Sequence, residues 1–328
     1  MTPRPGDAGD AGPDREGSRR PRRPPASPLP DRDGVPAARL HLPGDGTWAT
    51  VAAFLSERTH HAPGVAERLA AGQVLLGDGT QVGPDTRYAA GQWVYLYRDP
   101  PDEVHVPGEI AVLHADSDVV VVDKPPFLAT TPRGRHVRQT VLLRLRRDLD
   151  MPELAPAHRL DRLTAGVLLL TTRREVRGAY QELFAHREVR KTYLALAPIR
   201  EDLALPTVLR SRIVKHRGEL QARQVPGEPN AVTRVELLRR QRVCGGDVGL
   251  YRLTPQTGRT HQLRVHLASL GIPILNDPLY PEVLDRAPGD FTSPLQLLAR
   301  RLEFTDPLSG ELRRFTSRRR LPATSLGD

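Results

Sequence analysis

The chain has 328 residues, about twice the length of a typical domain, so small disulfide-stapled scaffolds are excluded. Its 48 Lys+Arg against 39 Asp+Glu give a net charge of +9, and 38% hydrophobic residues suffice for a globular core. This charge permits a polyanionic partner. The basic residues are nearly all arginine, which suits phosphate contacts, although a GC-rich genome gives the same bias without functional meaning.

The single cysteine, Cys244, excludes an internal disulfide and a multi-thiolate metal site. No apolar run approaches the roughly 18 residues that a membrane span needs. The N-terminus also lacks the apolar core of a signal peptide. We therefore expect a cytoplasmic, monomeric protein without a membrane segment.

Composition divides the chain into three parts. Residues 1–38 are rich in Pro, Arg and Gly with few large apolar residues, which predicts a disordered tail. Residues 39–100 predict a small α/β module. Residues 101–328 follow a Pro-rich linker at 99–102 and predict the main domain.

The small module is expected to contain two helices and two strands. Apolar spacing indicates helices around 50–57 and 64–71, and β-type runs indicate strands at 73–76 and 92–97. Its order of elements weakly resembles the small RNA-binding domain named for a ribosomal small-subunit protein.

The main domain begins with two consecutive strands, at 110–114 and 119–122. Apolar residues at helical spacing then predict helices over 138–149 and 174–187. Strands and helices mix further along without regular βαβ alternation. This pattern favours an α+β fold over a doubly wound sheet.

The segment from His158 to Gly166, His-Arg-Leu-Asp-Arg-Leu-Thr-Ala-Gly, places one carboxylate, Asp161, in a turn between two arginines. An apolar strand at 167–170 follows at once. A carboxylate so placed is held rigidly and kept ionised by its neighbours. The alternative is an ordinary turn aspartate paired with a nearby arginine.

Two further segments favour a site. Residues 257–267 predict a helix, capped by Thr257 or Thr260 and ending near Gly271, on which Arg264 can reach inward to a carboxylate. The alternative is a surface helix with solvated charges. Residues 190–196 predict an alternating strand that carries Tyr193. Taken alone, Tyr193 is more typical of an aromatic residue in the core or at the sheet edge.

Together these segments resemble the RluA-type RNA pseudouridine synthases. The resemblance covers about residues 110–280, including Val122-Asp123-Lys124-Pro125, His158-Arg159-Leu160-Asp161, Lys191-Thr192-Tyr193 and the run from Thr257 to Arg264. Their order and spacing agree, which is more specific than any one motif. This chain departs from the family at Leu163, often a charged residue, and at Asn276-Asp277, often Gly-Asp. Neither departure is expected to touch the residues of the chemistry.

The resemblance implies a synthase fold with a mixed, largely antiparallel central sheet flanked by helices, and an isomerase that converts uridine to pseudouridine in ribosomal or transfer RNA without a cofactor. It implies that Asp161 is the catalytic carboxylate, Arg264 its ion-pair partner and Tyr193 the ring against the base. The implied substrate-binding residues are Arg159, Arg162, His261 and Leu263.

Three alternatives compete with a cofactor-free synthase. A metal site at His158, His261 and His266 is disfavoured, because their spacing fits neither one helix face nor one strand face and no other ligand completes the set. A glycosidase acting on free nucleosides lacks the second carboxylate. A catalytically inactive RNA-binding protein of the same fold is the remaining alternative.

The positive charge gathers in the main domain. Residues 101–328 hold 36 Lys+Arg against 27 Asp+Glu, whereas residues 1–100 carry 12 of each. Two arginine clusters, around 133–147 and 313–320, are candidates for RNA phosphate contacts. We therefore expect the main domain itself to hold the RNA.

Overall fold

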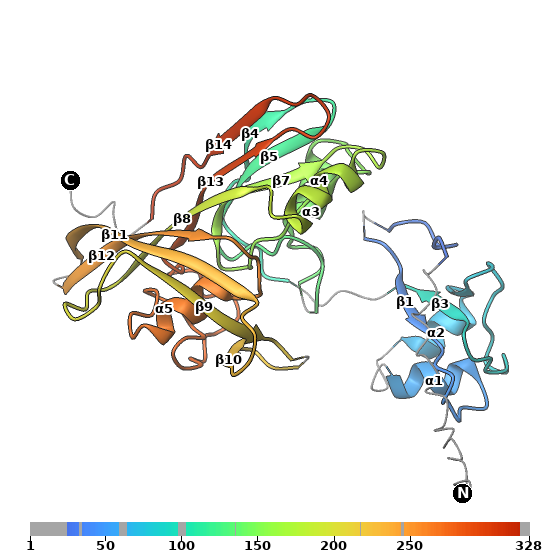
Figure 1. The fold of residues 1–328 in the computed structure, drawn as a ribbon. Coiled ribbons are helices and arrows are strands. Elements are labelled where there is room, and N and C mark those ends of the chain that lie inside the picture. Colours follow the sequence, from blue (N-terminus) through green and yellow to red (C-terminus); the bar gives the residue numbers. More distant parts are fainter. Residues whose placement is uncertain are drawn as a thin grey trace, which may run out of the picture. The chain divides into compact units, whose positions relative to one another are not determined.

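The computed structural model describes residues 25–32, 35–58, 64–97, 103–134, 136–216, 218–243 and 246–321. It divides the chain into two compact units (Figure 1), a small one of residues 1–32 and 36–98 and a large one of residues 33–35 and 99–328. The expected linker at 99–102 and Cys244 lie outside the described residues.

The small unit has a three-stranded antiparallel sheet in the order β1 (Ala38–His41), β3 (Trp93–Leu96), β2 (Val74–Leu76). Helices α1 (Val51–Arg58) and α2 (Val65–Ala70) pack on it. Each helix buries the apolar residues of one stripe, as amphipathic spacing requires. The two helices and two strands expected here are confirmed.

Residues 1–24 of the expected tail lie outside the described residues. Residues 25–32 contact strand β3 and its continuation. The Tyr95 hydroxyl donates to the Pro25 carbonyl at 2.6 Å, and the Tyr97 hydroxyl to the Pro30 carbonyl at 2.7 Å. The Arg32 guanidinium lies 4.0 Å from the centre of the Tyr97 ring. This part of the segment is therefore packed on the small unit.

The described residues of the large unit form an 11-stranded sheet with the order β10-β9-β11-β12-β8-β13-β7-β5-β4, in which β14 also pairs with β13 and β6 with β7. The pair β13 and β7 is parallel and the others are antiparallel, so the predicted α+β class with a largely antiparallel sheet is confirmed. The strands are β4 (Ala111–Ala115), β5 (Val119–Lys124), β6 (Ala155–Pro156), β7 (Ala165–Thr171), β8 (Arg190–Pro198), β9 (Thr207–Val214), β10 (Arg223–Val225), β11 (Ala231–Val243), β12 (Gly246–Pro255), β13 (Leu297–Thr305) and β14 (Leu312–Thr316).

Alternation along β5 and β7 builds two cores, one on each face of the sheet. Val120 and Val122 face α3 (Val141–Asp148) and α5 (Gln262–Ser269), which belong to the same apolar cluster. Val119 and Val121 belong to the cluster of α4 (Arg177–Ala185) on the other face. Both strands are buried along nearly their whole length, which explains their uninterrupted apolar sequences.

Candidate active site

Asp161 lies in the loop between β6 and β7, at the end of β7 that pairs with the end of β5. Its side chain is half-buried. Within the described ranges, no hydrogen bond or ion pair involves the Asp161 carboxylate; the Asp161 carbonyl accepts from Thr164 N–H at 3.1 Å and closes the turn. The carboxylate is therefore free to meet a ligand.

The loop is fixed on both sides of Asp161. The Thr130 hydroxyl donates to the Leu160 carbonyl at 2.8 Å and accepts from Leu160 N–H at 3.2 Å. The fully buried Lys124 ammonium, at the end of β5, donates to the carbonyls of Arg162 at 3.1 Å, Pro125 at 2.9 Å and Leu128 at 2.7 Å. These contacts hold the backbone and leave the carboxylate unused, a function of Lys124 and Thr130 that the sequence did not indicate.

Gly166 allows β13 to approach this loop closely. Its φ is +113°, and a Cβ there would lie 2.3 Å from the Ala299 carbonyl oxygen. Any other residue would therefore be strained and would push away the strand that pairs with Tyr193.

His158 has a structural role. Its Nε2 accepts from Leu169 N–H at 3.2 Å, and its ring stacks on Phe184 with centroids 4.5 Å apart. Burial lowers the pKa of His158 to about 3, so the ring is neutral and can accept this bond at neutral pH.

Tyr193, His261 and Arg264, together with Lys124 and Tyr280, surround Asp161 closely enough that its charge acts on each. Burial raises the pKa of Tyr193, and the Asp161 charge adds to this effect, so the phenol stays protonated. Burial lowers the pKa of His261 and of Lys124, and Asp161 opposes both shifts. The structure thus brings three of the predicted site residues around Asp161.

Arg264 was expected to form an ion pair with Asp161, but it forms one with Asp277 instead. Arg264 binds Asp277, with Nε donating to Oδ2 at 2.7 Å and Nη2 to Oδ1 at 2.6 Å. Burial opposes the charge on Arg264, but the bonds to Asp277 outweigh it and raise the pKa of the guanidinium. The expectation that Asn276-Asp277 lies apart from the chemistry is therefore wrong. The Gly-Asp pair of the family was the signal that could have revealed Asp277.

The start of α5 also differs from the expectation. His261 is the residue before the helix, with φ +57° and no capping side chain, so the predicted cap by Thr257 or Thr260 is wrong. The Thr257 hydroxyl instead donates to Gln262 Oε1 at 2.7 Å, and Gln262 Nε2 donates to the Val232 carbonyl at 3.1 Å. This buried amide ties the turn of residues 257–261 to β11.

The other predicted residues complete two sides of the site. Leu263 is buried in the main core with Leu160 and Leu163, which makes it a candidate apolar wall. The side chains of Arg159 and Arg162 are exposed and have no ion-pair partner among the described residues. They are therefore available to a ligand.

The two arginine clusters are largely used inside the protein. Arg144 is buried and donates to the Val106 carbonyl at 2.8 Å, so its expected phosphate contact is wrong. In the second cluster, Arg313 pairs with Asp116 and Asp306, and Arg314 with Glu303. Arg135 lies outside the described residues.

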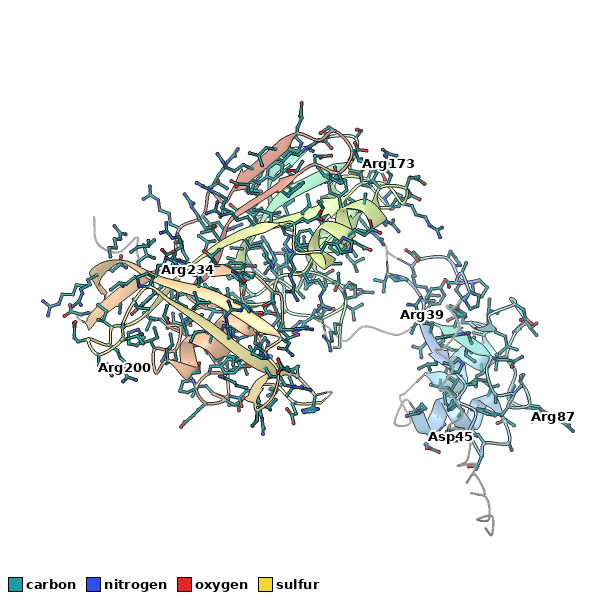
Figure 2. All side chains as sticks on the ribbon, viewed as in Figure 1. Arg39, Asp45, Arg87, Arg173, Arg200 and Arg234 are labelled. Carbon is teal, nitrogen blue, oxygen red and sulfur yellow. The ribbon has the colours of Figure 1, made fainter. Side chains whose placement is uncertain are left out.

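Many surface arginines are likewise paired with acids. Figure 2 labels Arg173, Arg200 and Arg234 on the large unit. These bind Asp118, Asp202 and Glu236, respectively. Position in a basic run therefore says little about which arginines can reach a phosphate.

The three histidines that suggested a metal have separate partners. His261 Nδ1 lies 2.9 Å from the Tyr280 hydroxyl and His266 Nε2 lies 2.9 Å from the Ser211 hydroxyl, while His158 Nε2 accepts from Leu169 N–H on β7. In the part of the chain that the structure describes, no group of three or more His, Cys, Asp or Glu is placed to hold a metal. No described helix is both long and apolar enough to cross a membrane.

Comparison with known proteins places this arrangement among RNA-modifying enzymes. Residues 118–269 match the family model described as RNA pseudouridylate synthase. An uncharacterised RNA pseudouridine synthase of Synechocystis sp. is 34% identical over 233 residues, 69% of this chain and 78% of that protein. The human pseudouridylate synthase RPUSD2 is 36% identical over 178 residues, 53% of this chain and 31% of that protein. Among solved structures, human RNA Pseudouridylate Synthase Domain Containing 1 is similar with a TM-score of 0.51 and 25% identity, over 65% of this chain and 86% of that one.

Proposed function

The chain belongs to the RNA pseudouridine synthase family, whose members are isomerases, and we propose that it converts uridine to pseudouridine in structured ribosomal or transfer RNA with Asp161 as the catalytic carboxylate. One observation carries the proposal. Asp161 sits in a loop that Lys124 and Thr130 fix through its backbone, while its own carboxylate has no partner among the described residues.

The reaction breaks the C1′–N1 bond, turns the uracil, and forms a C1′–C5 bond. The C5 proton is lost and N1 gains a proton, so no redox step or external group is needed and no cofactor takes part. A single carboxylate can act as a nucleophile toward the sugar or as a base that removes a sugar proton, and both routes remain open. The uracil that leaves can carry negative charge, so a second carboxylic acid is not required.

The neighbours of Asp161 suit the other needs of the reaction. Tyr193 presents a protonated, half-buried ring on which the uracil can stack, and Leu263 supplies the apolar wall. Arg264 brings a permanent positive charge close to Asp161.

A uridine in folded RNA must be flipped out to reach Asp161. Flipping costs a few kcal/mol, and stacking on an aromatic ring returns roughly 1–3 kcal/mol. The unpaired Arg159 and Arg162, on either side of Asp161 in the chain, supply phosphate contacts at the same place, and His261 lies beside the base. A cytoplasmic location and a monomeric state stay predictions from the sequence.

The test is tritium release from RNA labelled with [5-³H]uridine, isolated from cells that lack this gene. Asp161→Asn should lower the single-turnover rate by at least about 100-fold, because the reactive carboxylate is lost. RNA binding should change little. Asp202→Asn, at a surface acid paired with Arg200, is the matched control and should keep full activity.

Turnover retained in Asp161→Asn would remove Asp161 from catalysis. RNA binding without tritium release by the unmodified protein would favour the inactive RNA-binding alternative. Fractionating the labelled RNA before the assay separates ribosomal from transfer RNA as the substrate.

A further inference from the structure

The three-stranded sheet of the small unit has two chemically different faces. On β3, Val94 and Leu96 belong to the apolar cluster that includes α1 and α2. Alternation along the strand places Trp93 and Tyr95 on the opposite face, and Tyr97, which directly follows β3, continues the same row. This side, turned away from the helices, is called the outer face. It carries three aromatic rings in a row.

Strand β1 adds basic and polar groups to the outer face. Its His41 is paired in register with Trp93 and its Arg39 with Tyr95, and residues directly opposite each other in a sheet share a face. Both side chains are exposed. The His41 and Trp93 rings have centroids 4.9 Å apart, and Arg39 (Figure 2) has no ion-pair partner among the described residues. The outer face therefore combines aromatic rings with an available cation.

Residues 25–32, called the strap, cover one end of the outer face. The Tyr95 hydroxyl donates to the Pro25 carbonyl at 2.6 Å, and the Tyr97 hydroxyl donates to the Pro30 carbonyl at 2.7 Å. Tyr95 is 1% exposed and Tyr97 8%, whereas the first ring of the row is only half-buried. The strap thus covers two of the three aromatic rings.

The strap contacts the sheet through groups that another ligand can supply. Its prolines have no N–H group and cannot extend the sheet as a strand does. The Ser27 hydroxyl accepts from Leu29 N–H at 3.2 Å and donates to the Leu29 carbonyl at 2.8 Å, so these bonds stay within the strap. The Arg32 guanidinium carbon lies 4.0 Å from the centre of the Tyr97 ring. A ligand with carbonyl oxygens and planar groups offers the sheet the same contacts.

Unpaired nucleotides carry these groups together. Uracil has carbonyl oxygens that can accept from tyrosine hydroxyls, and its planar ring can stack on an aromatic side chain. The phosphate beside it suits the guanidinium of Arg39. Sites for single-stranded nucleic acid combine such rings with basic side chains, whereas a duplex keeps its bases stacked inside. Since the chain belongs to a family of RNA-modifying enzymes, single-stranded RNA is the ligand that the outer face fits best.

The helix side of the small unit is a poorer candidate for RNA contacts. Helices α1 and α2 carry Arg58 and Arg68 beside Glu57 and Glu67, so their charges balance. Arg68 is also buried. The basic and aromatic groups that RNA needs are therefore found together on the outer face.

We propose that the outer face binds the unpaired bases of single-stranded RNA and that the strap competes with RNA for this face. The face consists of Arg39, His41, Trp93, Tyr95 and Tyr97. The apparent affinity for RNA is then the intrinsic affinity multiplied by the fraction of molecules whose strap has moved away. Binding does not involve Asp161, so this site is independent of the proposed catalytic function.

The experiment follows Trp93 fluorescence while single-stranded oligouridylate is added to the full chain. The chain has two tryptophans, and Trp48→Phe leaves Trp93 as the reporter. A base that stacks on Trp93 should quench its emission, whereas RNA bound elsewhere should not. Oligouridylate paired with oligoadenylate should quench little, because its bases stay in the duplex. Arg39→Gln should reduce the slope of log affinity against log salt by about 0.7, the value for one phosphate contact of a single strand.

Gly77→Ala tests the competition without changing an aromatic ring. A Cβ at Gly77 would lie 2.9 Å from Pro25 Cγ, whose rigid ring cannot turn aside, and 3.6 Å from Trp93 Cβ, which is an ordinary contact. The strap should therefore move away, and the affinity for oligouridylate should rise by about 5-fold or more. Gly44→Ala is the matched control and should change nothing, because a Cβ there meets no atom within 4 Å.

Arg32→Gln is a second way to loosen the strap. It removes the cation that lies over the Tyr97 ring and should raise the same affinity by about 2- to 5-fold. Because it leaves Gly77 in place, it decides the matter if Gly77→Ala disturbs the end of β2.

Trp93 emission that oligouridylate leaves unchanged, with and without Gly77→Ala, would overturn the site. Equal affinities in Gly77→Ala, Arg32→Gln and the Gly44→Ala control would overturn the competition. Quenching by a synthetic peptide with the sequence of residues 25–32, without quenching by RNA, would assign the outer face to proline-rich peptides instead. Asp161→Asn should be quenched as the unmodified protein is, so a failure here leaves the proposed catalytic function untouched.

Discussion

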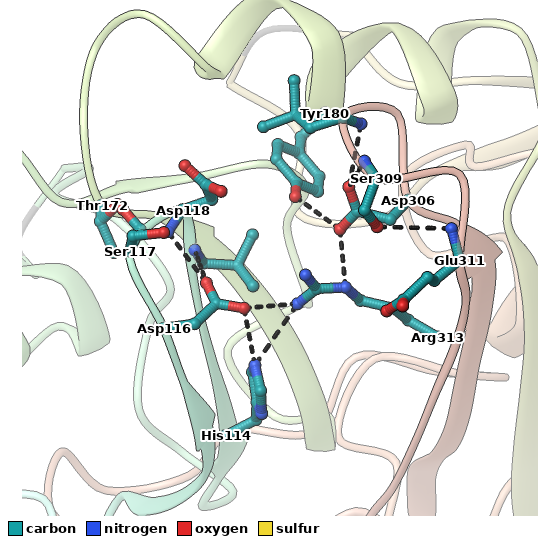
Figure 3. A network of polar contacts seen from close by, with 12 residues as sticks. His114, Asp116, Ser117, Asp118, Thr172, Tyr180, Asp306, Ser309, Glu311 and Arg313 are labelled. Atoms are coloured by element: carbon teal, nitrogen blue, oxygen red, sulfur yellow. Dashed lines mark hydrogen bonds and ion pairs between the residues drawn. The ribbon is translucent and has the colours of Figure 1, made fainter.

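Two places in the large unit differ in how they use acidic side chains: one pairs them with neighbours, and the other leaves its acid unpaired. In the network of Figure 3, Asp116 accepts from Arg313 Nη1 at 2.5 Å and from Val119 N–H at 2.8 Å, and lies 2.9 Å from His114 Nε2. Asp306 accepts from the Tyr180 hydroxyl at 2.7 Å and pairs with Arg313 Nε at 2.7 Å. The carboxylates of Asp116 and Asp306 are thus both used by the fold.

Asp161 is arranged the other way. The bonds that fix it go to the carbonyl and amide groups of its neighbours, donated and accepted by Lys124 and Thr130. The comparison shows how a protein can hold a carboxylate in place without pairing it: hydrogen bonds fix the backbone of the loop, and the side chain stays unpaired. Paired acids add stability, and the unpaired acid is available for chemistry.

The largest expected effect is on stability. Asp306→Asn should lower the free energy of unfolding of the large unit by about 1–3 kcal/mol, because it removes one of the two acids that pair with the mostly buried Arg313. Asp161→Asn breaks no pair and should change it by less than about 1 kcal/mol. Urea denaturation of the two variants measures the difference.

The spectroscopic probe has to be chosen with care. Both tryptophans, Trp48 and Trp93, belong to the small unit, so tryptophan fluorescence follows that unit and serves as an internal control. Far-UV circular dichroism reports on both units, so a transition that appears there and not in the fluorescence belongs to the large unit. Equal destabilisation by the two variants would contradict the comparison.

The next effect concerns RNA binding by unpaired and paired arginines. Arg159 and Arg187 are exposed and have no ion-pair partner among the described residues, whereas Arg314 is paired with Glu303. Arg159→Gln and Arg187→Gln should each reduce the slope of log affinity against log salt by about 1. Arg314→Gln should leave it nearly unchanged. Filter binding of ribosomal and transfer RNA at several salt concentrations measures the slopes, and an equal change in all three variants would refute the distinction.

The smallest expected effect is the loss of stability of the large unit at acid pH, through Asp116 and Asp306. Burial works against the charge on Asp116, but its bonds to Arg313, His114 and the backbone outweigh burial and lower its pKa. Burial also works against the charge on Asp306, but its bonds to Tyr180 and the backbone and the charge of Arg313 outweigh burial and lower its pKa. Stability from a lowered carboxyl pKa is present above the unfolded value near 3.8 and is lost as pH falls below it.

We therefore expect the free energy of unfolding of the large unit to decline below about pH 4, and to decline less steeply in Asp116→Asn. Urea denaturation at pH 5, 4 and 3 measures both slopes. Parallel curves for the variant and the unmodified chain would show that Asp116 does not contribute.

Local elements followed closely from the sequence. The run Val119–Val122 is apolar on both faces and could only be a buried strand, and the helical spacing of Val176, Tyr180 and Leu183 fixed the buried face of α4. Errors arose where a side chain had several possible partners. Threonine is a common helix-capping residue, yet the Thr257 hydroxyl forms its hydrogen bonds with Gln262 and Val232 instead.

The prediction that the arginine clusters contact phosphates was unreliable for a related reason. A run such as Arg313-Arg314 is equally basic whether its members face solvent or acids from other strands. Asp116 and Asp306 are 197 and 7 positions from Arg313 in the chain, and only the sheet brings all three together. A count of charges gives only the composition of a surface. Which of those charges can bind a phosphate depends on whether they are already paired with acids.

The sequence by itself determined the family and the reaction class and led to the proposal of Asp161 as the acid, because the motif around Asp161 is local and its order relative to Tyr193 and Arg264 is specific. Only the tertiary structure decided how these residues work together. It assigned Arg264 to Asp277, clamped the Asp161 loop with Lys124 and Thr130, and used most of the clustered arginines internally. The physical reason is that a hydrogen bond or ion pair depends on distance and direction within a few ångströms, and long-range folding sets both.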